Sequence, residues 1–227
     1  MQQLTVNRDD IPNTVNERVQ GILREVSGPQ ILHVGCVGHK VPKTPFEASH
    51  SLHFQLCKRF GMVEILGLDI DLAGLDEMKR MGFNVVAGDA QNLEFESTFD
   101  TIVAGELIEH LQSPGLFLES CARVLNPRGR VVISTPNVFS VMLGLMYFKN
   151  YDRAFNPEHV AWFCPQTLRE MAKRCGFTLT SLHFVDDLEP ELVSSRFYKT
   201  FVGAWKGIRP LFPSRYRNTM IAVLTTR

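Results

Sequence analysis

The sequence lacks the marks of several protein classes. It has no uninterrupted apolar run of about 18 residues, so we expect no membrane-spanning helix. Its 24 basic residues equal its 24 acidic ones in number, which argues against polyanion binding through bulk charge, and no nucleic-acid-binding module is recognisable. Residues 1–10 are polar and hold no signal-peptide core. We therefore expect a soluble, cytoplasmic protein that does not bind nucleic acid.

Cysteine is scarce and its spacing is uninformative. The five cysteines include no C-x-x-C pair, and their odd number argues against a disulfide framework. His50 and His53 have a spacing that two metal ligands could use, but no nearby cysteine or carboxylate completes a ligand set. We interpret this pair as one face of a helix and expect no metal site.

The chain alternates short apolar runs with helical segments. We expect strands at 31–34, 63–68, 83–87, 99–104, 130–134, 177–184 and 218–224, and helices at 15–26, 48–60, 72–81, 116–125 and 167–175. Such alternation predicts β-α-β crossovers and a mostly parallel sheet of the α/β class. Ligands of these sheets bind beyond the carboxyl ends of the strands.

Three loops after successive predicted strands hold residues suited to a nucleoside. Gly35 and Gly38 follow the first strand and allow a ligand to approach the backbone, although a tight turn would explain them equally well. Asp69 ends the second strand, where a carboxylate accepts hydrogen bonds from both ribose hydroxyls. Asp89 follows the third strand and can accept from the adenine amino group or form an Asx turn. The three loops in order predict a nucleoside site.

The first loop departs from a dinucleotide site. It lacks G-x-G-x-x-G, and Pro42 and Pro45 delay the next helix. No helix N-terminus is therefore placed to hold a pyrophosphate. We keep a nicotinamide-dependent oxidoreductase only as an alternative.

Five segments resemble class I S-adenosylmethionine-dependent methyltransferases, namely 31–38, 66–71, 85–90, 99–111 and 124–137. Residues 158–160 and 168–177 resemble the ubiquinone-biosynthesis-like and polysaccharide-cluster branches. The resemblance implies a Rossmann-like seven-stranded sheet with helices on both faces and an antiparallel last strand. It also implies a single domain over 1–227, with a cofactor-binding core at 28–185 and lid, substrate or interaction elements at 138–165 and 186–217.

The resemblance implies S-adenosylmethionine as methyl donor and S-adenosylhomocysteine as product. By position, Gly35 and Gly38 line the methionine end, Asp69 holds the ribose, Asp89 and Ala90 meet the adenine, and Glu106 and Leu107 flank the sulfonium. His33, Cys36 and Ile70 are further cofactor-binding candidates.

Two departures from the family concern the cofactor. His33 stands where the family usually has an acid that holds the methionine amino group, and the glycine loop continues into a proline-bearing segment. These departures motivate the first alternative, a non-catalytic binding or scaffold protein with the methyltransferase fold, which we place ahead of the oxidoreductase.

A hydroxyl acceptor needs a base, and imidazole suits this task near neutral pH. His110 follows the fourth strand, and His159 lies in a segment that often closes over the site in the family. Glu109 is a further candidate that could orient the hydroxyl. A helix-capping role for His110 and a packing role for His159 are the alternatives. We favour O-methylation of a small molecule, a sugar, lipid-linked glycan precursor or phenol.

Two segments bear on the acceptor and on partners. Residues 138–148 are almost wholly apolar and predict a core helix, a homodimer contact or a lid over an apolar acceptor. Residues 192–217 hold six basic residues and six aromatic ones but no acid. This composition suits an anionic membrane surface or a lipid-linked substrate, which would place the protein at the inner membrane face, but also a helix packed on the core.

Overall fold

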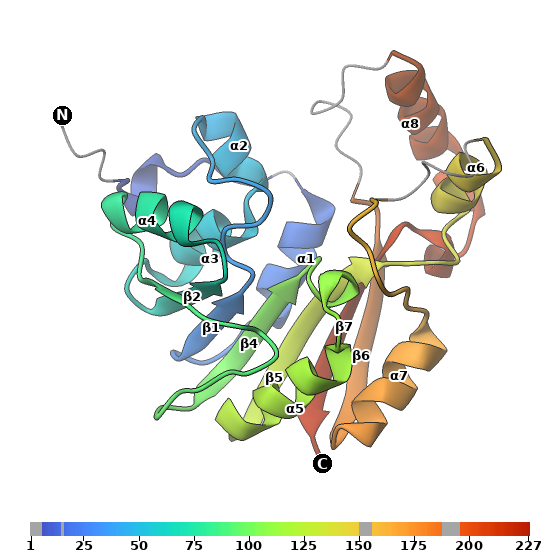
Figure 1. Ribbon diagram of the computed structural model, residues 1–227. Helices are drawn as coiled ribbons and strands as arrows, with labels where there is room; N and C mark the ends of the chain where they lie inside the picture. Colours follow the sequence, from blue (N-terminus) through green and yellow to red (C-terminus); the bar gives the residue numbers. More distant parts are fainter. Residues whose placement is uncertain (1–5, 15, 150–155, 188–195) are drawn as a thin grey trace.

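The computed structural model describes residues 6–14, 16–149, 156–187 and 196–227 (Figure 1). Its strands form one sheet in the order β3-β2-β1-β4-β5-β7-β6. They are β1 (Ile31–Val34), β2 (Ile65–Asp69), β3 (Val85–Ala87), β4 (Phe99–Gly105), β5 (Leu125–Pro136), β6 (Phe177–Val185) and β7 (Thr219–Thr226). The first five pair in parallel, and β7 runs antiparallel to both β5 and β6. The predicted fold class, including the antiparallel last strand, is confirmed.

Helices cover both faces of the sheet, as predicted (Figure 1). The described helices are α1 (Glu17–Glu25), α2 (Pro45–His50), α3 (Leu52–Phe60), α4 (Leu72–Arg80), α5 (Pro114–Val124), α6 (Val141–Lys149), α7 (Pro165–Arg174) and α8 (Arg196–Ile208), with short 3-10 turns η1 (Arg8–Asp10), η2 (Ile108–His110), η4 (Arg209–Leu211) and η5 (Ser214–Tyr216). On β4, Ile102 belongs to a buried cluster with α5 and α7, whereas Val103 belongs to a cluster with α1, α3 and α4. Successive side chains of a strand point to opposite faces, so this buried strand contributes to both layers.

The helix expected over 48–60 is divided in two. Pro45 occupies the first turn of α2, and Thr44 and Glu47 form a capping box that starts this helix earlier than predicted. Ser51 is extended and separates α2 from α3. His50 and His53 therefore lie on different helices, and the one-face interpretation of this pair was wrong.

Helices α6 and α8 lie side by side apart from the sheet (Figure 1). Their contact is a small buried cluster of Met142, Val202 and Trp205. Leu145 is half exposed and Phe148 is 93% exposed, so α6 is not a core helix of this chain. A lid or a dimer contact stays a prediction. No described helix combines the length and apolar character needed to cross a membrane.

Candidate active site

A cavity of about 560 Å³ opens at the carboxyl ends of β1, β2 and β4. Parallel strands place the loops that follow them at one edge of the sheet, which is where the sequence predicted the ligand. Most of the predicted site residues line this cavity: His33, Gly35, Cys36, Gly38, Asp69, Ile70, Glu106, Leu107, His110 and His159.

Asp69 joins the end of β2 to the glycine loop after β1. Its Oδ2 accepts the Val37 N–H at 2.9 Å, and its Oδ1 accepts the Asp71 N–H at 3.1 Å. Gly35 and Gly38 both have positive φ, 78° and 63°, which favours glycine at these positions. The carboxylate is therefore held in place beside a backbone that a ligand can approach.

Glu106 lies at the end of β4 in a sparsely populated backbone conformation. Its φ of 52° is the one positive value among the described non-glycine residues. The Ser134 hydroxyl donates to its carboxylate at 3.0 Å, and the Glu106 N–H donates to the Ser134 carbonyl at 2.9 Å. Burial raises the pKa of Glu106, the charge of Arg18 acts to lower it, and that of Asp187 to raise it. Backbone strain of this kind is typical of functional sites.

His33 and His53 form a buried pair at the floor of the cavity. Their Nδ1 atoms lie 3.1 Å apart and their rings are stacked, so one nitrogen donates and the other accepts. His53 Nε2 also lies 3.6 Å from the Cys57 sulfur. Burial lowers the pKa of His33 well below its usual value and that of His53 to about 3. Both rings are therefore neutral, and His33 supplies no charge to the cavity.

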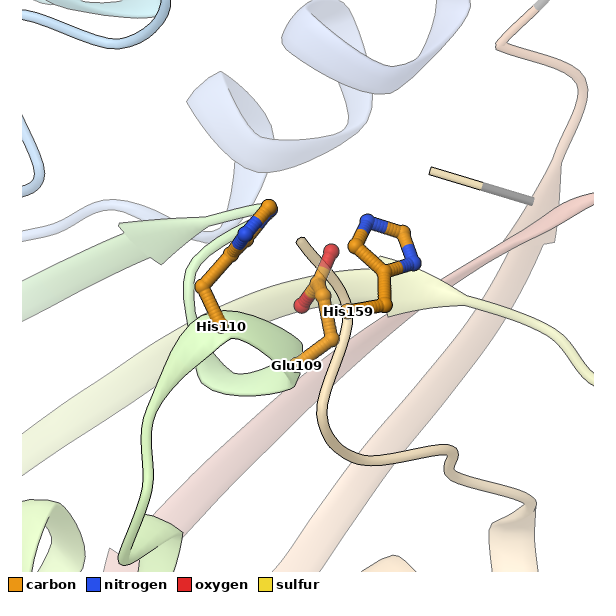
Figure 2. Close-up of side chains that lie close together, drawn as sticks. All are labelled: Glu109, His110 and His159. Carbon is orange, nitrogen blue, oxygen red and sulfur yellow. The ribbon is translucent and has the colours of Figure 1, made fainter. Parts of the chain in front are cut away.

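Glu109, His110 and His159 form a second cluster, with one ligand-type atom of each within 4.8 Å of the others (Figure 2). η2 carries the first two, and the Val160 and Ala161 N–H groups donate to the Glu109 carbonyl at 2.8 and 3.1 Å, which fixes the His159 segment beside it.

The polar atoms of this cluster are incompletely bonded. Glu109 is 1% exposed and accepts the Thr135 hydroxyl at Oε2, 3.0 Å away. Its Oε1 and the Nδ1 of His159 have no hydrogen-bond partner in the described structure. Burial, and then the Glu106 carboxylate, raise the pKa of Glu109, while burial lowers the pKa of His110 and His159.

Three of the predicted site residues do not line the cavity. Glu109 lies beneath its surface, with a carboxylate oxygen within 4.8 Å of a ring nitrogen of each of the two histidines that do. Asp89 is exposed and accepts the Gln91 N–H at 2.8 Å in an Asx-type turn, and Ala90 is buried in the core. The adenine role of Asp89 and Ala90 stays a prediction.

Other residues of the cavity wall were missed from the sequence. Arg18 of α1 and Asp187, just after β6, line the cavity and form an ion pair at 2.6 Å. They are far apart in the chain and neither follows a parallel strand, so no spacing in the sequence indicated them. His53 also lines the cavity and was considered only as a partner of His50.

Comparison with known proteins places this chain in a family. Residues 15–182 match the sequence model of a family described as a methyltransferase domain. The chain is 26% identical over 212 residues to the mitochondrial ubiquinone biosynthesis O-methyltransferase of Rattus norvegicus and 29% identical to that of Homo sapiens, with 87% of this chain aligned in each case. These alignments cover 54% and 51% of the two relatives, so the chain spans about half the length of these curated relatives.

Solved structures share the fold at low sequence identity. An S-adenosylmethionine-dependent methyltransferase from Thermotoga maritima has a TM-score of 0.65 and 15% identity, covering 92% of this chain and 87% of its own. Phosphoethanolamine N-methyltransferase 2 from Haemonchus contortus, solved with S-adenosylmethionine, has a TM-score of 0.61 and 18% identity, covering 92% and 52%. Since the family model matches well over half of its residues, the chain belongs to the methyltransferase domain family of class I S-adenosylmethionine-dependent methyltransferases.

Proposed function

We propose that this protein transfers a methyl group from S-adenosylmethionine to an oxygen of a small molecule. The observation that carries the proposal is that one cavity is lined both by the glycine loop with Asp69 and by His110 and His159, with Glu109 buried behind the two histidines. When bound, S-adenosylmethionine supplies a methyl group made electrophilic by a sulfonium.

The cofactor side of the cavity fits a nucleoside of this kind. Its volume of about 560 Å³ suits a small-molecule site. A Cβ atom added to Gly38 would meet no atom within 4 Å, so open space lies beside the loop backbone. Each oxygen of Asp69 accepts one backbone N–H and keeps a lone pair for a ribose hydroxyl.

The remaining cofactor contacts are assigned by position. Gly35, Gly38 and Cys36 would line the methionine end together with His33, whereas Glu106 and Leu107 would flank the sulfur. The adenine would extend past Ile70, which also lines the cavity, toward Asp89 and Ala90. Methyl transfer depends mainly on orientation and exclusion of water, which these residues would supply.

The acceptor side holds the groups that would act on a hydroxyl. His110 and His159 line the cavity, and one of their imidazoles would accept the hydroxyl proton. Glu109 would act through the two rings that lie beside it. The curated relatives are named for O-methylation in ubiquinone biosynthesis, which supports a phenol, whereas the Haemonchus contortus enzyme is named for N-methylation.

We propose further that the acceptor is linked to a lipid. Phe148 of α6 and Leu211 of η4 are exposed apolar side chains, and Lys206 and Arg215 lie on α8 and η5. Apolar and basic groups together favour an acceptor presented at an anionic lipid surface. Flotation with vesicles of neutral and anionic lipid would test this, and equal recovery with both would contradict it.

Cofactor binding is tested first by thermal unfolding and calorimetric titration with S-adenosylmethionine and S-adenosylhomocysteine, with a dinucleotide as control. At 100 times its Kd a ligand stabilises the native state by about 2.7 kcal/mol, which raises Tm by several degrees. Asp69→Asn should weaken binding, whereas the matched change Asp76→Asn, at an exposed position of α4, should not. No response to either sulfur nucleoside would contradict the proposal.

Catalysis is tested separately by transfer of a radiolabelled methyl group to a panel of catechols, phenols and sugars. Transfer to a phenol and not to its methyl ether would establish oxygen as the acceptor atom. Cofactor binding without transfer to any acceptor would favour a non-catalytic binding or scaffold protein.

A further inference from the structure

We propose that His33 donates a hydrogen bond from its Nε2–H to the carboxylate of the methionine part of S-adenosylmethionine, and that His53 and Cys57 behind it keep the proton on that nitrogen. The inference rests on the proposed function for the identity of the ligand. His33 is then a binding residue, whereas His53 and Cys57 are positioning residues that act through it.

The three side chains form a buried row at the floor of the cavity. His33 Nδ1 lies 3.1 Å from His53 Nδ1, and His53 Nε2 lies 3.6 Å from the Cys57 sulfur. Burial lowers the pKa of both histidines and raises the pKa of Cys57 to about 12, so the rings are neutral and the thiol keeps its proton. Each nitrogen of a neutral imidazole either donates or accepts, so one proton position determines the others along the row.

The acceptors along this row favour one order of protons. The S–H of Cys57 can donate to Nε2 of His53, which leaves the His53 proton on Nδ1, where it donates to Nδ1 of His33. The proton of His33 is then on Nε2. In the opposite order the Nε2–H of His53 would point at the Cys57 sulfur, which is only a weak acceptor. His33 therefore presents an N–H, and not a lone pair, at its other nitrogen.

The sheet makes room for this row. Gly67 is the partner of His33 on β2, and a Cβ atom added there would lie 2.8 Å from Cε1 of His53. The Phe83 ring meets the His53 ring edge-on, with centroids 5.4 Å apart. The missing side chain at Gly67 and the contact with Phe83 hold the His53 ring against His33, so the pairing is built into the fold.

Nε2 of His33 is open to the cavity. His33 is 2% exposed and lines the cavity. Among the described residues its ring bonds only through Nδ1, to His53. Yet Nε2 is not one of the fully buried polar atoms that lack a partner. A ligand in the cavity can therefore reach this nitrogen.

The methionine end of the cofactor offers this N–H one suitable acceptor. Its ammonium only donates and its sulfonium is positively charged, whereas its carboxylate accepts through two oxygens. Arg18 lines the same cavity, and its positive charge acts on His33. Although Asp187 pairs with Arg18 at 2.6 Å, this charge favours an anionic group beside His33 over an ammonium. A donor at position 33 therefore binds the opposite end of the amino acid from the one that an acid there would bind.

The first measurement determines the proton positions in the protein without cofactor. The seven histidine rings are labelled with ¹⁵N and observed in long-range proton–nitrogen correlation spectra, in which bare and protonated ring nitrogens are well separated. Signals are assigned by their loss in His33→Gln and His53→Gln. We expect protons on Nε2 of His33 and Nδ1 of His53. A bare Nε2 on His33 would overturn the proposal.

Cys57→Ala tests the positioning role, with Cys57→Ser as the conservative variant. A serine hydroxyl still donates to His53, so the His33 proton should stay on Nε2. Alanine removes the donor and should leave a mixture of the two proton orders. Cys121→Ala, at an equally buried cysteine of α5, is the matched control and should leave both rings unchanged. A single, unchanged proton order in Cys57→Ala would show that Cys57 does not position His33.

Calorimetric titration identifies the group that His33 binds. His33→Phe keeps a flat ring but removes the N–H, and it should raise the Kd for S-adenosylmethionine at least about 10-fold, the loss expected for a hydrogen bond to a charged group. The Kd for decarboxylated S-adenosylmethionine should not change. Equal losses for the two ligands would overturn the assignment.

The wild type supplies a second measurement if His33→Phe does not fold. Its His33 Nε2–H signal should move when S-adenosylmethionine is added and stay in place with the decarboxylated form. Equal shifts with both would overturn the assignment. Failure of the wild type to bind S-adenosylmethionine would contradict the proposed function itself, whereas unchanged binding by His33→Phe would overturn this assignment alone.

Discussion

Acid should destabilise this protein through His53, a histidine held neutral inside the fold. His53 is 1% exposed, and burial lowers its pKa from 6.5 to about 3. Below pH 6.5 the unfolded chain takes up a proton that the native state does not bind, so stability is fully present above pH 6.5 and is lost as the pH falls toward 3. The loss reaches about 2 kcal/mol between pH 7 and pH 5 for this one residue.

The surroundings of His53 determine how this effect is read. His33 faces it from β1 and is also buried with a lowered pKa, Cys57 lies one turn along α3, and Cys36 approaches from the glycine loop. Because His33 adds to the same acid sensitivity, the wild-type total exceeds the part due to His53 alone. The informative quantity is therefore the difference between the wild type and His53→Gln.

Urea unfolding at pH 7 and pH 5, with a chelator present and no cofactor, measures that difference. The wild type should lose about 2 kcal/mol more than His53→Gln between the two pH values. His183→Gln removes an exposed histidine and controls for the loss of an imidazole. An equal loss in the wild type and His53→Gln would refute the reasoning, because it would mean that His53 titrates alike in the folded and unfolded chains.

Three further predictions concern the cofactor, the core and a thiol. Asp69→Ala should raise the Kd for S-adenosylmethionine at least about 100-fold in calorimetric titration, because hydrogen bonds to a charged group contribute about 1.5–3 kcal/mol each and two ribose hydroxyls would be lost. Phe117→Ala should lower the free energy of unfolding, measured in urea, by about 3–5 kcal/mol, because this side chain is fully buried between α5 and the sheet. A smaller loss would show that the surrounding core collapses into the space left by the phenyl ring. Burial acts to raise the pKa of Cys164, but hydrogen bonds from the backbone and hydroxyl of Thr167 lower it. Iodoacetamide should therefore modify Cys164 first, as read by peptide mass spectrometry. Earlier modification of the buried Cys57, whose pKa is raised by burial, would contradict this.

The fold was largely predictable from local pattern. Alternating apolar and helical segments placed β1 at its observed bounds and the other strands within a few residues, except that β5 begins five residues earlier than expected. The error at α2 and α3 came from local chemistry, since the capping box of Thr44 and Glu47 starts a helix at Pro45 and Ser51 then interrupts it. The antiparallel position of β7 came from family resemblance, because a strand pattern does not specify its direction.

The site was predictable where it depends on strand ends and unpredictable where it depends on packing. Gly35 and Asp69 follow directly from the rule that ligands bind beyond parallel strands. His110 and His159 were each candidates, but only backbone hydrogen bonds across about fifty residues bring them to the same carboxylate. Arg18 reaches the cavity from a helix that precedes the sheet, a position to which no motif pointed.

His33 stands where the family usually has an acid, but the cavity still holds a carboxylate, that of Glu106. His33 is neutral and paired with His53, so it cannot meet a methionine ammonium as a carboxylate does. Glu106 lines the same cavity, and its carboxylate is held by the Ser134 hydroxyl at the end of the neighbouring strands. An ammonium bound there would add to the positive charge of Arg18 and favour the ionised form of Glu106. We therefore expect Glu106, in addition to flanking the sulfur, to contact the amino group in place of residue 33, which makes the histidine compatible with a working cofactor site.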